Sequence, residues 1–494
     1  MSKNNPQFEK HHRIAVIGAG PAGVHIASLL KRRGYNDVTV LEKSSRIGGK
    51  SYTCIKDGVL YEMGTCFLHH GYHRIKDLVR TYGLREGVAL QGRAVFQDEN
   101  TDNLASLELS EFVASSIYDG WQQQYPQWKW LPEWLVKTRL LKAIWSYNRL
   151  YRQLFGASKL PYGMPLHLPP VVLERIDMTF LEFLQQNKLD ALIDFLRIIQ
   201  AAQGYGYLET IPAYYGLCWV TPEFLNGLVK QITGLTKITK MLPDGYEALW
   251  RTIAEKDALT IKFNAAIHSI DRQAPEGKVM IDYTNGEGTR QFAVYDFLIL
   301  TMNLRDALEL IKDPTETELR LFTTLKGFTL TTTLYKSDPV SGFSTPDYDK
   351  AGAYFPDVLR PGRDNEWYAD RHIFAKANGL RKCFDRQMRV AFQFSEMEAP
   401  ERHDRLPPFK RNAEIAAKLE ASWARWSVSN PQIVEQFSWP YFMHFPGWAI
   451  RKGYLNELFE YQGRHRTWYA GASASFESVN HVVNYNHALI DTYL

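Results

Sequence analysis

Residues 13–50 have the sequence RIAVIGAGPAGVHIASLLKRRGYNDVTVLEKSSRIGGK, and this stretch decides the fold. An apolar run, Ile14–Ile17, leads into three glycines spaced Gly-x-Gly-x-x-Gly, and an amphipathic helix pattern continues to Arg33. A second apolar run, Val38–Leu41, ends at Glu42. This order of strand, glycine turn, helix, strand and acid is typical of a βαβ unit that binds a nucleotide.

Each glycine of the turn has a physical role beside a bound phosphate. Gly18 allows the tight turn, Gly20 lets the backbone approach a pyrophosphate, and Gly23 lets the helix pack against the strand. The start of the helix, which includes Ala22, offers free N–H groups and a positive dipole end to the phosphates. Glu42 follows about 20 residues later, where a carboxylate accepts hydrogen bonds from the ribose hydroxyls. We therefore predict a dinucleotide site.

The residues around and after Glu42 indicate which dinucleotide binds. Glu42 repels a 2′-phosphate, which disfavours NADP. A second glycine turn, Gly48-Gly49, has cations beside it, and a plain NAD dehydrogenase does not need such a turn. A larger flavin dinucleotide lying across the sheet edge has a use for it. The contacts expected here are Lys43, Arg46, Gly49 and Lys50.

Three motifs together resemble one family. GAGPAG in the first turn, LEKSSRIGGK after the second strand and YEMGT at Tyr61–Thr65 are similar to the N-terminal region of FAD-dependent amine-oxidase-type flavoproteins. The resemblance implies FAD and adds Gly64 and Thr65 to its contacts. It also implies an α/β fold with a discontinuous Rossmann-type FAD-binding domain, an α+β substrate domain and a helical subdomain.

Two later segments resemble the remainder of this FAD domain. Phe263–Ile267 is similar to the strand whose backbone covers the adenine, which implies a contact at Ala266. Thr467–Gly471 and the helix pattern Val479–Tyr493 are similar to the C-terminal flavin-binding strand and helix. The contacts implied there are Gly471, Ala472 and the amides of Val479 and Asn480, near flavin N1 and O2. Many relatives have Gly-Glu in place of Gly471-Ala472, so the ribityl contacts of that Glu are not carried over.

The FAD domain is expected to be interrupted by two substrate segments. The expected order is a first FAD-binding segment over 1–95, a helical substrate or lid subdomain over 96–245, a second FAD-binding segment over 246–310, an antiparallel-sheet substrate domain over 311–450 and a third FAD-binding segment over 451–494. No second GxGxxG follows a strand, and the short motif Gly204-Tyr205-Gly206 lacks the third glycine. An enzyme of this kind, without a site for NAD(P)H, takes its electrons from its substrate.

Composition sets limits on the class of protein. At 494 residues the chain is too long for one compact core. A net charge of +4 without a long Lys/Arg run does not indicate nucleic acid. The polar N-terminus and the lack of a run of about 20 apolar residues indicate a soluble protein. The four scattered cysteines are expected to be free thiols in a reducing cytoplasm, and none of them follows Cys383, so FAD is expected to be noncovalent.

The segment from Trp121 to Phe155 combines tryptophans with cations. On a helical template the residues placed on one apolar face are Trp134, Leu141, Ile144 or Trp145, Tyr151 and Phe155. Such a helix either docks on the protein with its cations in water or makes a transient contact with a membrane surface. We expect the docked arrangement.

Further segments resemble one branch of the superfamily, the polyunsaturated fatty acid isomerases. These are Thr179–Phe195, Ala201–Leu217, Leu242–Trp250 and Trp439–Gly471. The resemblance implies a free fatty acid as substrate and a role in lipid metabolism, with double bonds moved into conjugation by hydride abstraction and return through flavin N5. No catalytic residue beyond the flavin is assigned. Aromatic side chains are expected to line the pocket: Tyr205, Tyr207, Tyr441 and Phe442. Arg93 lies where the family places an arginine for the carboxylate.

Other functions stay open on this sequence. An oxidase of amines or amino acids shares the same FAD motifs, but the Gly-Tyr that amine oxidases often carry is absent from Phe476–Val479. Lys336 lies in a broadly suitable strand for the lysine that many such oxidases place near N5. A carotenoid-type desaturase and a non-catalytic flavin-binding protein are further alternatives. His69, His70 and His481 show no metal-ligand spacing, so no metal is expected.

Overall fold

The computed structural model of the protein describes most of the chain. The described residues are 9–56, 59–91, 94–97, 104–107, 126–128, 133–232, 239–338, 353–354, 357–360, 367–371, 388–396, 417, 419–420, 423–424 and 429–493. Arg93 and Cys383, both named above, lie outside them.

A five-stranded parallel sheet forms the nucleotide-binding region of the fold. Its order is β10 (Thr260–Lys262), β2 (Val38–Leu41), β1 (Ile14–Ile17), β14 (Phe297–Leu300) and β21 (Thr467–Tyr469). Every residue of β1, β2 and β14 is buried, as continuous apolar runs in a parallel sheet require when both faces are covered. The helices that pack around α1 (Pro21–Arg32) include α10 (Tyr246–Lys256) and α17 (Val479–Tyr493).

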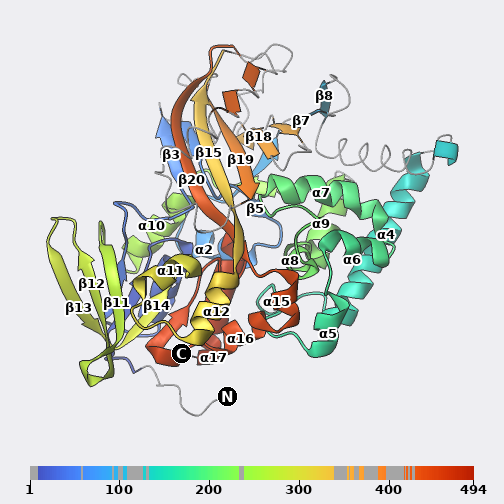
Figure 1. Ribbon diagram of the computed structural model, residues 1–494. Coiled ribbons are helices and arrows are strands. Elements are labelled where there is room, and N and C mark those ends of the chain that lie inside the picture. Colours follow the sequence, from blue (N-terminus) through green and yellow to red (C-terminus); the bar gives the residue numbers. More distant parts are fainter. Residues whose placement is uncertain are drawn as a thin grey trace.

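A second sheet is antiparallel and flanks the first. Its strands are β11 (Ala266–Ala274), β12 (Lys278–Thr284) and β13 (Arg290–Tyr295), followed by α11 (Leu304–Leu310) and α12 (Glu316–Thr324). The fully buried side chains of Arg272 and Glu318 form an ion pair that ties β11 to α12. Figure 1 shows this sheet at one side of the molecule and the helices α4 to α9 at the other.

A seven-stranded sheet stands above the parallel sheet in Figure 1. Its order is β20 (Gln432–His444), β15 (Lys326–Lys336), β19 (Met388–Glu396), β18 (Trp367–Arg371), β17 (Asp357–Arg360), β7 (Ala94–Gln97) and β8 (Leu104–Leu107). The smaller sheets are β3 (Thr53–Lys56) with β4 (Val59–Glu62), and β16 (Ala353–Tyr354), β6 (Val88–Gln91), β9 (Thr239–Met241) and β5 (Leu68–His69). In β20 only the last residues, Phe442–His444, are buried, so this end of the strand enters the core.

Helices fill the space beside the nucleotide-binding region. They are α2 (His73–Thr81), α4 (Glu133–Phe155), α5 (Pro170–Arg175), α6 (Phe180–Gln186), α7 (Ile193–Ala202), α8 (Ala213–Trp219), α9 (Pro222–Ile232), α15 (Gly447–Arg451) and α16 (Tyr454–Glu460). Short 3₁₀ turns lie at Pro126–Trp128, Asp190–Leu192, Pro275–Gly277 and Arg464–Arg466. Thr179 and Glu182 form a capping box at the start of α6. Within the described portion of the chain, no helix has the length and apolar character that a membrane crossing requires.

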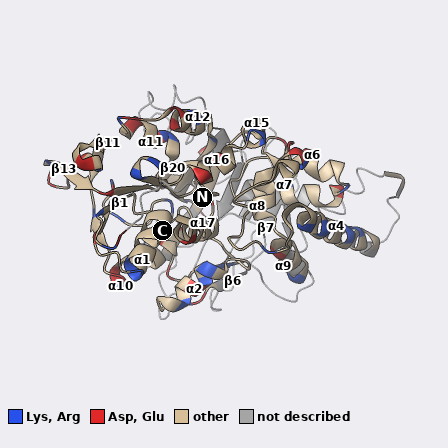
Figure 2. Ribbon diagram, turned by 90° about the horizontal axis from the view of Figure 1, so that it is seen from below, with Lys and Arg blue, Asp and Glu red and all other residues tan. Residues whose placement is uncertain are grey.

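The apolar face predicted for α4 is partly wrong. Leu141 is 50% exposed and Trp145 is 59% exposed, and Figure 2 shows the cations distributed along this helix. Ile144 and Tyr151, two members of the predicted face, are buried, and the other buried residues recur at helical spacing around them. These buried residues are Leu140, Ile144, Tyr147, Tyr151 and Leu154. The helix therefore docks on the protein, as expected, with Leu141 and Trp145 outside its buried face.

Candidate cofactor and substrate site

The first glycine turn has the close contacts that its spacing predicts. Gly18 has a φ of 103°, in the region that favours glycine. A Cβ at Gly23 would lie 1.8 Å from the Gly18 carbonyl oxygen, so only glycine fits there. Helix α1 begins at Pro21 after Gly20, with no side-chain cap and no acidic residue in its first turn. Its first N–H groups, including that of Ala22, are therefore left for another acceptor.

The second glycine turn lies directly against the first. The Gly48 N–H donates to the Ala19 carbonyl at 2.9 Å, and a Cβ at Gly49 would lie 3.1 Å from the Cα of Gly20. Arg46 holds this turn, because its Nη2 donates to the Gly49 carbonyl at 2.6 Å. The two turns form one surface of backbone groups, which suits the close approach of a pyrophosphate.

Glu42 lies at the end of β2, beside both turns. Its Oε2 accepts a hydrogen bond from the Ala19 N–H at 2.7 Å, and its Oε1 accepts one from the Ser44 N–H at 2.8 Å. Each carboxylate oxygen keeps further acceptor capacity for ribose hydroxyls. Lys43, the next residue, is exposed. The Ala265 N–H donates to the Glu42 carbonyl at 2.8 Å, which brings the segment before Ala266 to the expected adenine side.

A third group of predicted residues meets where the chain leaves β4. A Cβ at Gly64 would lie 1.8 Å from the Lys50 carbonyl oxygen, and the Thr65 N–H donates to that carbonyl at 3.2 Å. The Ser51 hydroxyl donates to Thr65 Oγ1 at 2.9 Å. The structure therefore brings Lys50, Gly64 and Thr65 together.

The C-terminal residues reach the same side of the sheet. Gly471 has a φ of 90°, and a Cβ there would lie 2.7 Å from the Thr301 carbonyl, so the turn that carries Ala472 packs closely on β14. At the start of α17, the Ser478 hydroxyl accepts a hydrogen bond from the His481 N–H at 3.2 Å. This cap serves the third amide of the helix and leaves those of Val479 and Asn480 outside it. The residues present thus fit the phosphates and ribose of a flavin dinucleotide.

The sequence did not reveal an ion pair that joins these segments. The Lys50 ammonium pairs with the carboxylate of Glu477, whose side chain is 5% exposed. Lys50 Nζ also donates to the Pro440 carbonyl at 3.2 Å and lies 5.3 Å from the centre of the Tyr441 ring. Nothing in the spacing of Glu477 indicates this partner, because the contact depends on how β20 and the last loop meet.

Three of the four predicted pocket aromatics form one cluster. The Tyr205 and Tyr441 rings are nearly parallel, with centroids 6.4 Å apart, and Tyr205 lies 5.5 Å from Phe442. Phe476 joins them, 4.8 Å from Tyr205. Tyr207 is half-buried in the turn that follows Tyr205. We call Tyr205, Tyr441, Phe442 and Phe476 the ring cluster.

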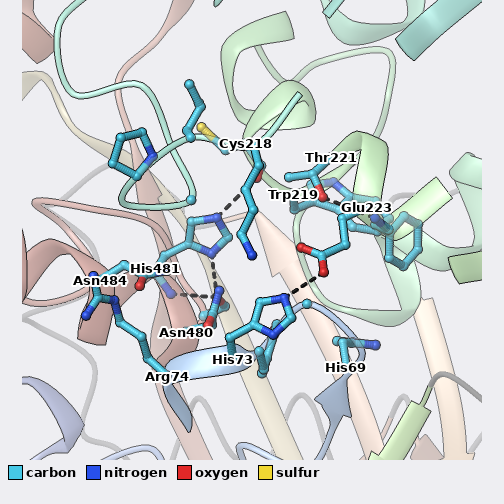
Figure 3. A pocket seen from close by; sticks show the side chains of 18 of the residues that line it. His69, His73, Arg74, Cys218, Trp219, Thr221, Glu223, Asn480, His481 and Asn484 are labelled. Atoms are coloured by element: carbon cyan, nitrogen blue, oxygen red, sulfur yellow. Dashed lines mark hydrogen bonds and ion pairs between the residues drawn. The ribbon is translucent and has the colours of Figure 1, made fainter. Parts of the chain in front are cut away.

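The ring cluster continues into a cavity of about 320 Å³ (Figure 3). The walls come from the start of α2, the loop after α4, the end of α8, the start of α9 and the start of α17. Tyr205 and Trp219, with ring centroids 6.0 Å apart, belong to its aromatic side. His73 Nε2 lies 2.6 Å from Glu223 Oε1, and Figure 3 shows these side chains pointing toward one another.

Two histidines of this cavity are neutral at ordinary pH. Burial lowers the pKa of His69 and of His481 to about 4. His481 Nε2 lies 3.1 Å from the Cys218 carbonyl, which can only accept, so this nitrogen donates and Nδ1 accepts from the Ser478 hydroxyl at 2.6 Å. Burial also raises the pKa of Tyr72 to about 12. These three side chains therefore make the cavity wall polar without adding charge to it.

The remaining candidates of the sequence are Lys336, His70 and the cysteines. Lys336 is exposed at the end of β15, and the His70 carbonyl accepts a hydrogen bond from Lys76 Nζ at 2.5 Å. Cys54, Cys66 and Cys218 are buried free thiols. In the described ranges, no group of three or more metal-binding side chains is close enough to hold an ion.

The glycine turns, the parallel sheet and the C-terminal strand and helix define the class of a flavin-dependent protein with a Rossmann-type fold. The family model for flavin containing amine oxidoreductase matches residues 21–334, and the chain belongs to this family. It is therefore an enzyme of a flavin-dependent family, as the resemblance of its motifs implied.

One curated relative and one solved structure extend over nearly the whole chain. The polyenoic fatty acid isomerase of Ptilota filicina is 23% identical over 505 residues, which cover 97% of this chain and 94% of that protein. The CLA-producing fatty acid isomerase from P. acnes has a TM-score of 0.71 at 20% identity and covers 99% of this chain and 100% of its own. Both similarities confirm the branch that the sequence resembles.

Amine oxidases share the fold at a greater distance. Putrescine oxidase bound to putrescine has a TM-score of 0.59 at 14% identity, covering 98% of this chain and 97% of its own. Together these structures confirm the predicted α/β class with a Rossmann-type FAD-binding domain. The domain boundaries and the individual cofactor contacts stay predictions.

Proposed function

We propose that this protein is an FAD-dependent isomerase that moves double bonds of a polyunsaturated fatty acid into conjugation. The observation that carries the proposal is its similarity, along nearly the full chain, to a polyenoic fatty acid isomerase and to the fold of a second fatty acid isomerase. The single GxGxxG site in the sequence supports it, because a redox-neutral reaction needs no NAD(P)H domain.

The cofactor in this proposal is noncovalent FAD. When bound, FAD supplies at N5 an acceptor that takes a hydride from the bisallylic carbon and returns it one double bond away. The backbone surface formed by Gly20 and Gly49 would hold the pyrophosphate, and Glu42 would hold the ribose. The amides of Val479 and Asn480, at the positive end of α17, would stabilise negative charge on the flavin pyrimidine.

In this proposal the protein's own residues position the substrate and exclude water from it. The ring cluster presents aromatic faces, which pack an unsaturated chain and stabilise the positive charge that develops when a hydride leaves. Tyr205, Phe442 and Phe476 are each at most 5% exposed, so water is excluded around them. His69 and His481 are neutral, and the Lys50 ammonium beside the Tyr441 ring is paired with Glu477.

An anaerobic experiment tests the proposal. Purified holoenzyme is mixed with linoleate, and absorbance is recorded at the conjugated-diene band and the flavin band together. We expect the diene band to rise while the flavin is oxidised at the end. Lasting bleaching of the flavin by an amine, with peroxide formed on admitting air, would establish an oxidase instead. If neither response occurs across broad substrate panels, the result supports a non-catalytic flavin-binding protein.

A further inference from the structure

We propose that the cavity in Figure 3 binds the carboxylate of the substrate through Arg74 and Lys159, with the aliphatic chain directed along Tyr205 to the ring cluster. The inference rests on the proposed function and adds to it the site that recognises the acid. It assigns the head group to Arg74 and Lys159 instead of Arg93, the arginine that the sequence suggested and that lies outside the described residues.

The first argument is the charge balance of the cavity wall. Of the two acidic residues of the wall, Asp77 pairs with Arg80, and Glu223 lies 2.6 Å from His73, which is charged only when protonated. Among the residues that the structure describes, Arg74 and Lys159 have no ion-pair partner. The two cations thus exceed the one carboxylate of the wall that has no Lys or Arg partner, Glu223, and this excess of positive charge favours an anionic ligand.

The second argument is an unpartnered buried amide in the same wall. Asn480 is 8% exposed, and its Oδ1 has no hydrogen-bond partner in the described portion of the protein. A buried polar group without a partner is destabilising, so this amide is available to a ligand. A carboxylate only accepts hydrogen bonds, so the group of Asn480 that serves it is the NH₂ end. Since either end of an amide can be turned toward a ligand, Asn480 can donate to a carboxylate oxygen.

The third argument is the close packing of the loop over this amide. Gly163 has a φ of 70°, and a Cβ there would lie 2.9 Å from Asn484 Nδ2 and 4.0 Å from Asn480 Nδ2. Figure 3 shows Arg74 beside Asn484, at the other side of the pocket from Glu223. One guanidinium and two amides thus line the same cavity, and such donors suit a planar carboxylate.

The fourth argument is continuity with the proposed reaction site. The ring centroid of Trp219 lies 5.0 Å from that of Phe224 and 6.0 Å from that of Tyr205. Tyr205 itself belongs to the ring cluster. A volume of about 320 Å³ is at the lower end for ligand pockets. The cavity therefore takes the head group and the first carbons, while the rest of a long chain follows the aromatic wall to the ring cluster.

The experiment measures binding without turnover. Calorimetry of the holoenzyme with decanoate, which has no double bond to isomerise, is compared with decanol, which lacks the charge. We expect Arg74→Gln and Lys159→Gln each to weaken decanoate binding at least about tenfold, about 1.4 kcal/mol, with little change for decanol. Arg74→Lys, which keeps the charge, should lose less. With linoleate, the same variants should raise KM more than they lower kcat.

Matched variants and a competing site complete the test. Arg175→Gln on α5 and Lys142→Gln on α4 remove exposed cations that do not line the cavity, and both should bind decanoate like the wild type. If only Arg93→Gln weakens decanoate binding, or if decanol binding falls equally in Arg74→Gln, the assignment is overturned. If decanoate binding depends on Arg74 but linoleate gives no diene, the carboxylate site stands and the isomerase function fails.

Discussion

The Glu477 carboxylate accepts a hydrogen bond from the Phe442 backbone N–H at 2.8 Å, and this contact fixes an irregular point of the long strand β20. Phe442 has a φ of 48°, an uncommon conformation for a residue with a side chain. The pairing register of β20 with β15 shifts at the same place. Since Glu477 also pairs with Lys50, one carboxylate joins the second glycine turn, the ring cluster and the loop before α17.

Replacing Glu477 should separate its two contacts. In Glu477→Ala the buried Phe442 N–H loses its acceptor, which should lower the free energy of unfolding by about 1–3 kcal/mol. Glu477→Gln keeps an amide oxygen for this N–H and should lose less. Urea unfolding of both variants measures the difference. Equal midpoints for the two variants would show that the hydrogen bond to Phe442 contributes nothing of its own.

Gly23→Ala should abolish cofactor binding. Its Cβ would lie 1.8 Å from the Gly18 carbonyl oxygen, so α1 must move away from the turn that carries Gly20. The purified variant should show no flavin absorbance, whereas the wild type should. Gly447→Ala is the control, because no atom lies within 4 Å of the added Cβ. A Gly23→Ala protein that retains its flavin would contradict the geometry of this turn.

Two glycines with similar backbone angles should respond differently to alanine. Gly204 and Gly288 have φ values of 74° and 78°, so both variants should lose about 1 kcal/mol to backbone strain. Only at Gly204 would the Cβ meet another group, a Tyr441 ring atom at 2.8 Å. Gly204→Ala should therefore lower kcat with linoleate, and Gly288→Ala should not. Equal kcat values for the two variants would show that the position of the Tyr441 ring does not affect catalysis.

The stability of the protein should depend on pH through Glu62. Burial raises the pKa of this carboxyl from its ordinary 4.5 to about 8. The folded state therefore holds the proton more tightly than the unfolded state, so its contribution to stability is complete below pH 4.5 and is lost as the pH rises to about 8. The free energy of unfolding of the wild type, relative to Glu62→Gln, should fall across this range. A constant difference would contradict the raised pKa.

The phase of α4 is testable by alanine at two adjacent faces. Ile144 is 4% exposed, and Ile144→Ala should cost about 2–5 kcal/mol. Leu141 is 50% exposed, and Leu141→Ala should change the free energy of unfolding by about 0.5 kcal/mol or less. Thermal or urea unfolding compares them. Similar losses would restore the apolar face first expected from the sequence.

Local patterns predict the nucleotide-binding region well. The strand Val38–Leu41 and the helix Val479–Tyr493 begin and end where the sequence indicates. Both are continuous elements with clear boundaries, so neighbouring residues determine them. The phase of α4 is not predictable in this way, because apolar residues occur on more than one face and only the neighbouring helices decide which face is buried.

The sequence suggests the members of the site more readily than their partners. Tyr205, Tyr441 and Phe442 are expected to line a pocket, and the structure brings them together. The pairing of Lys50 with Glu477 and the presence of Arg74 and Asn484 in one cavity wall are not foreseen, since each joins segments that are remote along the chain. Such contacts depend on how helices, strands and loops pack in three dimensions, and the spacing of residues along the sequence does not reveal this packing.

The parallel sheet has a consequence for the synthesis of the chain. Strand β14 pairs with β21, and α1 packs against α17. The parallel sheet and the packing of its first helix are therefore complete only when residues 467–493 have been made. Until these emerge from the ribosome, the edge of β14 at Leu298–Leu300 has unpaired backbone groups and apolar side chains. The newborn chain is therefore open to aggregation through this edge from the synthesis of β14 until β21 has been made.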